Sequence, residues 1–288
     1  MESTVQPADT PQPETVILTG EVSEEVRRVL AVAIGELGYT EGPNNLTKYG
    51  EWAGDKNAAW CAEFICWCVD AADRQNGTAL LGSVYPKYGG QNTGRDWFIT
   101  RGRFVYRRGN CPGWGYQWLR GSDHLLQKGE YVPRPGDLMF FSYNEAGDTE
   151  HVALVEYSAR AADGSVTVHV IEGNNPSSVQ RNTYSLSSSQ ILGFGATEDV
   201  VDTTMRSGCE GSKVLRLQQW LTKLGFLEEK HQTGAYGSNT KMAVAAWQRI
   251  MEGKAVNGIA DRETQQSIEA AIRRMEFDAP DTWLVEED

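Results

Sequence analysis

The sequence predicts an α+β domain followed by a small helical module. Helical patterns open the chain, strand patterns cluster in its middle, and helical patterns return after about residue 205. Helices followed by grouped strands are typical of α+β domains. A chain of 288 residues is longer than one average domain and can bury two separate cores. The parts we expect are a flexible tail at 1–20, the α+β domain at 21–197, a linker at 198–204, the helical module at 205–277 and an acidic tail at 278–288.

The composition is that of an ordinary soluble protein with an acidic balance. Lys and Arg number 27 against 39 for Asp and Glu, a net charge of −12, so we expect neither nucleic acid nor a membrane surface as partner. No apolar run reaches the length of a membrane span, and residues 1–14 lack the basic and apolar regions of an export signal. The odd, sparse set of cysteines argues against a disulfide framework and leaves at least one thiol free. These cysteines are Cys61, Cys66, Cys68, Cys111 and Cys209.

The α+β domain should begin with two helices. Ser23 is a suitable N-cap for an amphipathic helix that stops at Gly38. A turn-rich loop at 39–45 then leads to a second helix, which opens at Cys61. Its apolar residues fall on one stripe, so most of this helix should be buried. The stripe consists of Phe64, Ile65, Cys68, Val69 and Ala72, with Trp67 and Ala71 beside it.

Strand patterns follow an irregular aromatic segment. Between about residues 82 and 133, aromatic residues are interleaved with Gly and Arg without a strong period. A packed insertion and the wall of a substrate groove explain this segment equally well. After the turn at 133–137, apolar runs at 138–141, 152–155 and 166–171 predict three strands.

The helical module partly repeats itself. Each of its two repeats has an apolar helical stripe that ends near a glycine, followed by a comparable turn at 233–240 in the first repeat and at 257–264 in the second. The first stripe consists of Val214, Leu217, Leu221 and Leu224, and the second of Val244, Trp247 and Met251. Two helix-plus-loop repeats of this kind predict a small three-helix module.

Cys61 stands where a catalytic thiol would be held. At a helix N-terminus the unpaired N–H groups and the positive end of the helix dipole favour the thiolate, which is the nucleophilic form. Burial of the rest of the helix would fix the thiol rigidly. The alternative is that Cys61 is a small core residue, the commoner fate of a free cysteine.

A cysteine hydrolase also needs a base and a group that holds the base in the right tautomer. His151 begins the second strand at the edge where a polar loop meets the core, which suits a base that reaches a helix N-terminus. The next strand ends in Glu172 and Asn174, whose side chains can accept from an imidazole N–H. A solvated strand-end charge is the alternative for Glu172. The other histidines are His124, His169 and His231.

Four motifs occur in the same order as in a known family. They are Trp60-Cys61-Ala62 with Phe64, Pro135-Gly136-Asp137, Glu150-His151-Val152-Ala153-Leu154-Val155-Glu156, and Ile171-Glu172-Gly173-Asn174. Over residues 24–196 the chain thereby resembles the CHAP domains, the cysteine, histidine-dependent amidohydrolases/peptidases. The resemblance implies a papain-like α+β fold with an antiparallel sheet, with Cys61 as nucleophile and His151 as base and then acid. It also implies that Glu172 orients the imidazole and that Asn174 supports this set.

Two departures bear on what the resemblance implies. Glu150 precedes the histidine where Asp is more usual in the family, which should alter the loop rather than the chemistry. Some relatives carry calcium on a loop just before the nucleophile, but residues 48–56 offer only Glu51 and Asp55 as acidic ligands. We therefore expect no metal ion and no other cofactor.

A second set of signals spans residues 206–272. It consists of Gly211, Val214, Leu217, Gln218, Leu221, Leu224, Gly225, Gly234, Gly237, Thr240, Ala243, Val244, Trp247, Gln248, Asn257, Gly258 and Thr264. This spacing is similar to that of the type 1 peptidoglycan-binding domain, and a generic helical bundle is the alternative. Thr233 stands where Asp is usual and Ala260 where a second glycine is usual, so the ligand contacts of these turns are left open.

Together the resemblances imply a monomeric peptidoglycan hydrolase that acts at the bacterial cell wall through a cysteine nucleophile. The scissile amide is left open between that of an N-acetylmuramoyl-L-alanine amidase and that of an endopeptidase. The alternatives are a delivered antibacterial toxin or effector with the same chemistry, an enzyme for a small amide, and a catalytically inactive wall-binding adaptor. The missing export signal fits an endolysin released through a membrane hole, and equally an exported protein whose leader is not present here.

Overall fold

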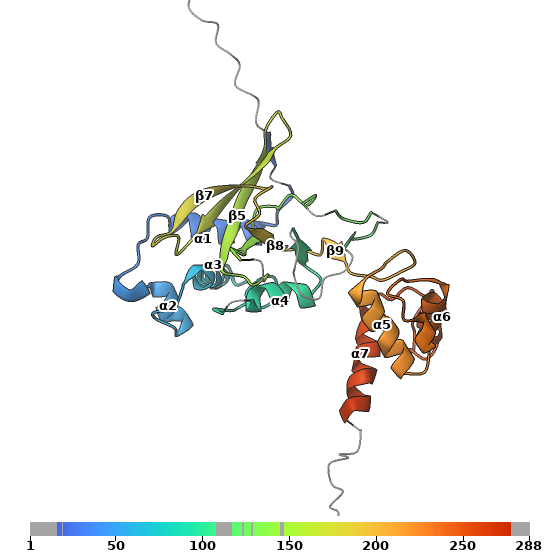
Figure 1. Cartoon of the computed structure of the whole chain (residues 1–288). Coiled ribbons are helices and arrows are strands. Elements are labelled where there is room, and N and C mark those ends of the chain that lie inside the picture. The colour runs from blue at the N-terminus through green and yellow to red at the C-terminus, as the bar shows by residue number, and fades with distance from the viewer. Residues whose placement is uncertain are drawn as a thin grey trace, which may run out of the picture. The chain divides into compact units, whose positions relative to one another are not determined.

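The computed structural model of the chain (Figure 1) describes residues 16–18, 20–90, 92–107, 117–122, 124–127, 129–144 and 147–277. Cys111, the tail expected at 278–288 and most of the tail expected at 1–20 lie outside these residues. The chain divides into two compact units, the first formed by residues 1–111 and 128–198 and the second by residues 112–127 and 199–288. None of the described helices is both long and apolar enough to cross a membrane.

The helices of the first unit precede most of its strands. They are α1 (Glu24–Gly35), the short 3₁₀ helix η1 (Pro43–Asn45), α2 (Lys48–Ala53), α3 (Cys61–Asn76) and α4 (Thr93–Thr100). The side chain of Ser23 accepts from the N–H of Val26 at 3.3 Å, which confirms the predicted N-cap of α1. The predicted second helix is α3, which begins at Cys61 and ends before Gly77 in the left-handed conformation. Helix α3 packs against α1 and against β5 and β6 of the sheet.

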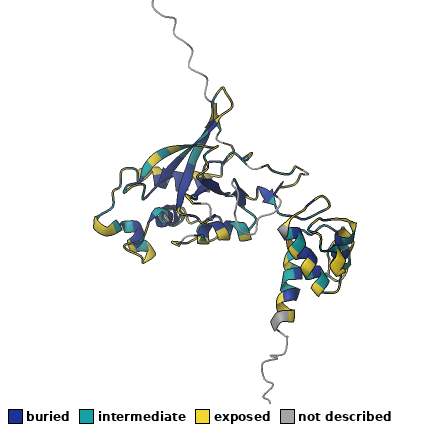
Figure 2. Cartoon of the chain, in the orientation of Figure 1, coloured by how far each residue is buried: buried dark blue, intermediate teal, exposed yellow. Residues whose placement is uncertain are grey.

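One antiparallel sheet forms the other layer of the first unit. Its strands are β1 (Val16–Leu18), β2 (Phe104–Tyr106), β4 (Leu138–Phe141), β5 (His151–Arg160), β6 (Val166–Glu172), β7 (Gln180–Ser185) and β8 (Ile191–Gly195). The order across the sheet is β2-β8-β4-β5-β6-β7, with β1 added on β5. The predicted runs at 138–141, 152–155 and 166–171 are β4, the first part of β5 and β6. Figure 2 shows the central strands largely buried, as expected for strands covered by a helix.

Strand β1 differs from the expectation of a flexible tail over residues 1–20. Val16, Ile17 and Leu18 pair antiparallel with Arg160, Ala159 and Ser158 of β5. Three residues are too few for a period to be read in the sequence, so only the partner strand reveals them.

The second unit is the three-helix module that the sequence predicted. It contains α5 (Ser212–Lys223), the short 3₁₀ helix η2 (Glu229–His231), α6 (Ser238–Gln248) and α7 (Arg262–Phe277). Its core is formed by the predicted stripes of the two repeats together with α7 and the turns. Buried members include Val214, Leu217, Leu221, Val244, Trp247 and Ile268.

The aromatic segment at 82–133 is divided between the two units. Helix α4 and strand β2 belong to the first unit, whereas residues 117–127 belong to the second. There β3 (Trp118–Leu119) pairs with β9 (Val201–Asp202), and the indole N–H of Trp118 donates to the Thr204 carbonyl at 2.9 Å. The guanidinium of Arg206 lies 3.6 Å from the centre of the Trp118 ring. Part of the segment expected as a linker at 198–204 is therefore strand β9 of the second unit.

Candidate active site

The thiol of Cys61 lies at the N-terminus of α3. Trp60 is the N-cap and Cys61 is the first residue of the helix. The first N–H groups of a helix have no partner within it, so the backbone presents donors and the positive end of the dipole at this point. Cys61 is half-buried, whereas the other described cysteines, Cys66, Cys68 and Cys209, are buried. Cys61 is therefore the described thiol that solvent reaches most easily.

Trp60 fixes the start of α3. Its indole N–H donates to Glu41 Oε2 at 2.6 Å, and its ring stacks on Tyr49 with centroids 5.4 Å apart. A Cβ added at Gly173 would lie 2.3 Å from the Trp60 ring, so only glycine leaves room for the indole there. The motif around the thiol and the motif at the end of β6 therefore pack directly on each other.

The loop before α2 lies along the segment that follows β6. Gly38 N–H donates to the Val179 carbonyl at 2.9 Å, Val179 N–H donates to the Tyr39 carbonyl at 2.8 Å, and Glu41 N–H donates to the Ser177 carbonyl at 3.1 Å. These bonds hold the loop at the same end of the sheet as the start of α3, which places the Glu41 carboxylate against Trp60.

His151 and Glu172 meet at one edge of the sheet. Because β5 and β6 are antiparallel neighbours, the first residue of β5 and the last residue of β6 lie at the same edge. His151 Nε2 is 2.6 Å from Glu172 Oε2, and the two residues are 8% and 0% exposed. The imidazole also hydrogen-bonds the Cys61 thiol. Since Nε2 faces the carboxylate, Nδ1 is the ring nitrogen left for the sulfur.

The surroundings of the pair favour the charged form of both partners. Burial by itself lowers the pKa of His151, but the hydrogen bonds with Cys61 and Glu172 outweigh burial and raise this pKa to about 9. Burial likewise raises the pKa of Glu172, but hydrogen bonds, first that of His151, outweigh it and lower this pKa. At neutral pH the imidazole is therefore protonated and the carboxylate ionised. A neighbouring imidazolium favours the thiolate form of a cysteine.

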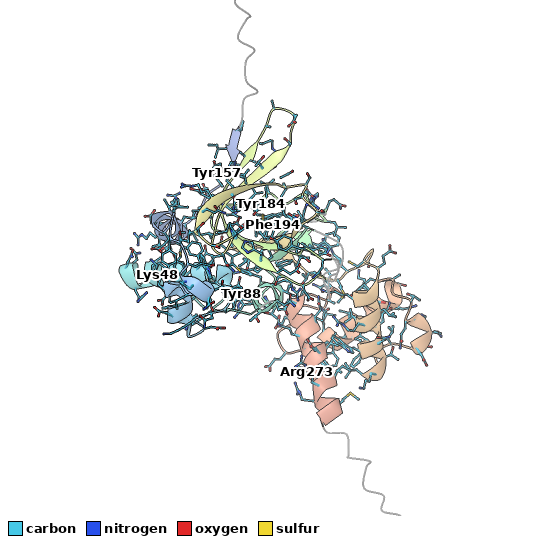
Figure 3. The ribbon with its side chains drawn as sticks, turned by 60° about the vertical axis from the view of Figure 1, so that its left-hand side comes forward. Lys48, Tyr88, Tyr157, Tyr184, Phe194 and Arg273 are labelled. Carbon is cyan, nitrogen blue, oxygen red and sulfur yellow. The ribbon has the colours of Figure 1, made fainter. Side chains whose placement is uncertain are left out.

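The second oxygen of Glu172 accepts three hydrogen bonds. Oε1 receives Asn175 Nδ2 at 3.0 Å, Asn182 Nδ2 at 2.5 Å and the Tyr184 hydroxyl at 2.8 Å. Tyr184 is among the labelled side chains of the sheet in Figure 3. Asn174, which the resemblance implied as the supporting residue, has a φ of 59° and makes no side-chain hydrogen bond to a described residue. Support for Glu172 comes from Asn175 and from β7 instead.

Sequence reasoning missed Asn175 and the two residues of β7. Strand β7 contains no apolar run, and its exposed and half-buried residues alternate along Gln180–Ser185. A period of two in a polar segment was the available signal. Its register with β6 places Asn182 opposite Val170 and Tyr184 opposite Val168, on the same face as Glu172. Only the pairing of the two strands reveals that these side chains turn toward the carboxylate.

A small cavity opens beside the thiol. Its volume is about 80 Å³, and it is lined by Ala59, Cys61, Ala62, Tyr88, Gly89, Gly90, Phe140, Thr149, Glu150, His151 and Val152. The Tyr88 hydroxyl is buried without a hydrogen-bond partner among the described residues. Two bonds tie the walls together, since Asn92 N–H donates to Thr149 Oγ1 at 2.7 Å and Thr149 N–H donates to Asn92 Oδ1 at 2.8 Å. The stretch at 88–92, within the aromatic segment, thus forms one wall of the site.

Glu150 closes the loop before His151. Its Oε2 accepts from the Tyr143 backbone N–H at 2.5 Å. The half-exposed Tyr143 ring stacks on Phe141, and burial followed by the charges of Glu172, Cys61 and Glu150 raises the pKa of its hydroxyl to about 12. The contact agrees with the expectation that Glu150 acts on the loop.

The remaining histidines lie away from Cys61. His169 stacks on Tyr157 with centroids 4.2 Å apart, and its Nδ1 bonds the Thr183 hydroxyl. His231 bonds Asn239 through Nδ1, and His124 belongs, with His231, to the second unit.

The described residues contain no group of three or more His, Cys, Asp or Glu side chains able to hold a metal ion. Of the two carboxylates considered for calcium, Glu51 pairs with Lys56 at 3.4 Å on the surface. Asp55 lies near Glu63, whose pKa is raised to about 7 by burial and then by the charge of Asp55. Since these residues do not form a ligand set, no step of the chemistry below uses a cation.

Comparison with protein families identifies both parts of the chain. Residues 52–174 match the CHAP domain, and residues 210–275 match the putative peptidoglycan binding domain. Searches of curated proteins and of solved structures found no significant match. The matched ranges contain the thiol, the His151–Glu172 pair and the three helices of the second unit. The papain-like α+β fold and the helical module agree with these families. The chain therefore carries a CHAP domain followed by a type 1 peptidoglycan-binding domain.

Proposed function

We propose that the protein is a cysteine-dependent peptidoglycan hydrolase that cleaves an amide bond of the wall peptide at Cys61. The two matched families support a peptidoglycan hydrolase that acts at the cell wall. The observation that carries the cysteine chemistry is the chain of contacts from the half-buried thiol through His151 to the buried Glu172 carboxylate. A nucleophile, a base and an orienting group in hydrogen-bond contact are the arrangement that acyl transfer requires.

The reaction begins with attack by Cys61. The thiolate forms a bond from Sγ to the amide carbon, and the backbone N–H groups at the start of α3 stabilise the negative charge on the carbonyl oxygen. His151 gives its proton to the leaving amine as the C–N bond breaks, which leaves a thioester. Water then attacks the thioester, His151 accepts its proton as base, and the C–Sγ bond breaks to release the acid and the thiol.

Glu172 has no bond-making role in this scheme. Its carboxylate holds the imidazole in one orientation and stabilises the imidazolium. The pKa of about 9 for His151 keeps the proton available for the leaving amine at neutral pH.

The second unit would anchor the enzyme on its insoluble substrate. A module that binds the wall weakly raises the local enzyme concentration without adding catalytic contacts. The catalytic part should therefore act on soluble wall fragments by itself, and anchoring should matter most on intact walls at low enzyme concentration.

Loss of turbidity of purified cell walls tests the proposal. Cys61→Ala should abolish lysis while leaving wall binding intact. The matched control is Cys68→Ala, a buried thiol two turns along the same helix that should cost stability at most. Lysis by Cys61→Ala equal to that of the unmodified protein would refute the cysteine mechanism. A folded chain that binds walls and cleaves nothing would identify an adaptor.

Mass spectrometry of the released fragments determines the scissile bond. A free stem peptide with an intact N-terminal alanine identifies an N-acetylmuramoyl-L-alanine amidase. Cleavage within the peptide identifies an endopeptidase.

A further inference from the structure

We infer that Asn182 and Tyr184 of β7 are positioning residues of the proposed reaction, because they hold Glu172 as a fixed carboxylate and through it orient His151 toward Cys61. The inference rests on the proposed function and deepens it. Neither residue touches the reacting atoms, and both lie on a strand outside the four family motifs and beyond the residues matched to the CHAP domain.

The burial of Glu172 creates the need for such donors. The residue is 0% exposed, and an ionised carboxylate without water is strongly destabilised unless hydrogen bonds replace its hydration. His151 occupies Oε2, so the charge on the other oxygen depends on Asn175, Asn182 and Tyr184. With three donors aimed at it, Oε1 has no place for a proton unless at least one donor turns away.

The network also fixes the direction of the carboxylate. Two donors come from one strand and the third comes from the turn after β6, so rotation of the Glu172 carboxylate would break bonds on two sides. The Tyr184 ring packs edge-on against Phe141 with centroids 4.8 Å apart, and Phe141 in turn contacts the His151 ring at 5.4 Å. The hydroxyl of Tyr184 and the imidazole are therefore held by the same aromatic side chain of β4.

Sheet packing alone does not require polar groups at these two positions. Asn182 and Tyr184 are half-buried, where a β-branched or aromatic residue without a hydroxyl would pair with β6 at no loss of packing. Their polar atoms are instead directed at one acceptor. Burial and then the charge of Glu172 raise the pKa of the Tyr184 hydroxyl, so it stays protonated and remains a donor over the working pH range.

Tyr184→Phe in the full chain removes one donor and keeps the ring against Phe141. We expect kcat to fall about tenfold with KM little changed, because a hydrogen bond to a charged group is lost without a substrate contact. The acidic limb of the pH profile should move to higher pH, since the Glu172 carboxylate now takes up a proton more easily. Asn182→Asp should move this limb further, because it replaces a donor with a second carboxylate.

A second readout does not depend on the substrate. The rate of alkylation of Cys61 by iodoacetamide, followed by peptide mass spectrometry across pH, reports the thiolate directly. Both variants should lose thiolate at a higher pH than the unmodified protein. The matched control is Thr183→Val between the two positions, whose hydroxyl contacts His169 rather than Glu172 and which should leave both profiles unchanged.

The outcomes separate this inference from the proposed function. Shifted alkylation profiles in a protein that does not cleave walls would retain the positioning role and refute the substrate. Unchanged pH profiles for Tyr184→Phe, with or without a lower melting temperature, would show that β7 is only structural and would overturn the inference. If Asn182→Asp does not fold, the conservative Tyr184→Phe decides the question by itself.

Discussion

In the second unit the buried polar side chains are neutral, whereas in the first unit a fully buried carboxylate faces an almost fully buried histidine. Gln218 in α5 shows how the second unit uses such groups. Its Oε1 accepts from the Gly234 N–H at 2.8 Å, and its Nε2 donates to the Ala235 carbonyl at 2.9 Å. One amide thus satisfies a donor and an acceptor of the turn that follows the first repeat.

The second repeat uses the same device. Gln248 in α6 accepts from the Gly258 N–H at 2.9 Å and donates to the Ile259 carbonyl at 2.8 Å. Both glutamines are completely buried and carry no charge. The His151–Glu172 pair differs because its members titrate and their pKa values are shifted in opposite directions. A satisfied neutral group stabilises a turn, while a buried charged pair beside an accessible thiol is the arrangement expected of chemistry.

Replacement of His151 should have the largest effect on this contrast. His151→Ala removes the acid and base, and we expect activity on purified walls to fall by about 10² or more. The fold should be retained, because Glu172 keeps its three other donors. His169→Ala on the neighbouring strand is the control for loss of a histidine. Inactivation by His169→Ala together with normal activity of His151→Ala would show that the strand assignment is wrong.

Glu172→Gln should leave residual activity. The amide keeps an acceptor for the imidazole but loses the charge that stabilises the imidazolium. The alkaline limb of the rate profile, expected near pH 9 from the raised pKa of His151, should therefore move to lower pH. Because that pKa is raised on folding from about 6.5, the stability it contributes is complete below this value and is lost as the pH rises through 9.

Thermal unfolding measures the same effect without a substrate. The unmodified protein should be more stable than Glu172→Gln near pH 6, and the difference should shrink toward pH 9. A constant difference across this range would mean that the His151–Glu172 contact does not carry the charge proposed for it.

Gly173→Ala should disturb the site through packing alone. The added methyl group would lie 2.3 Å from the Trp60 ring, so the indole and the start of α3 must move. We expect a loss of about 1–3 kcal/mol in the free energy of unfolding, with a further loss of activity as Cys61 moves from His151. Gly164→Ala is a control, since open space surrounds that position although its φ of 85° adds a small backbone cost. Full activity of Gly173→Ala would show that the two motifs are not coupled.

Gln248→Leu should have the smallest effect on chemistry. It leaves the Gly258 N–H without its acceptor, and we expect about 1–3 kcal/mol less stability in the second unit. Wall binding should be lost at a lower temperature, while cleavage of soluble fragments stays the same. Gln266→Leu, at an exposed position of α7, is the matched control. Equal loss of soluble-fragment cleavage in Gln248→Leu would break the division between structural amides and catalytic charges.

Much of the first unit could be predicted because its signals are local. The apolar stripe behind Cys61 has the helical period, and the runs at 138–141 and 152–155 are continuous, so α3, β4 and β5 follow from neighbouring residues. His151 and Glu172 were found because each stands at the end of such a run. Their catalytic roles stay predictions, since contacts alone do not measure turnover.

The second unit was predicted in type but not in extent. Its repeats gave the helices α5 and α6, and the family match confirms the module. Residues 117–127 were expected to belong with the catalytic domain, yet Trp118 packs on the core of the second unit. No local pattern connects Trp118 to Thr204 and Arg206, which lie more than eighty residues further along the chain.

The sequence by itself determined the α+β class, the helix that opens at Cys61, and the strand ends that carry His151 and Glu172, because period, caps and turn residues act over a few positions. Only the tertiary structure decided that Trp60 rests on Gly173 and that Asn182 and Tyr184 turn toward Glu172. These contacts depend on strand register and on close packing between distant segments. A shift of one residue in β7 would turn both donors to the other face of the sheet, and nothing within β7 alone specifies that register.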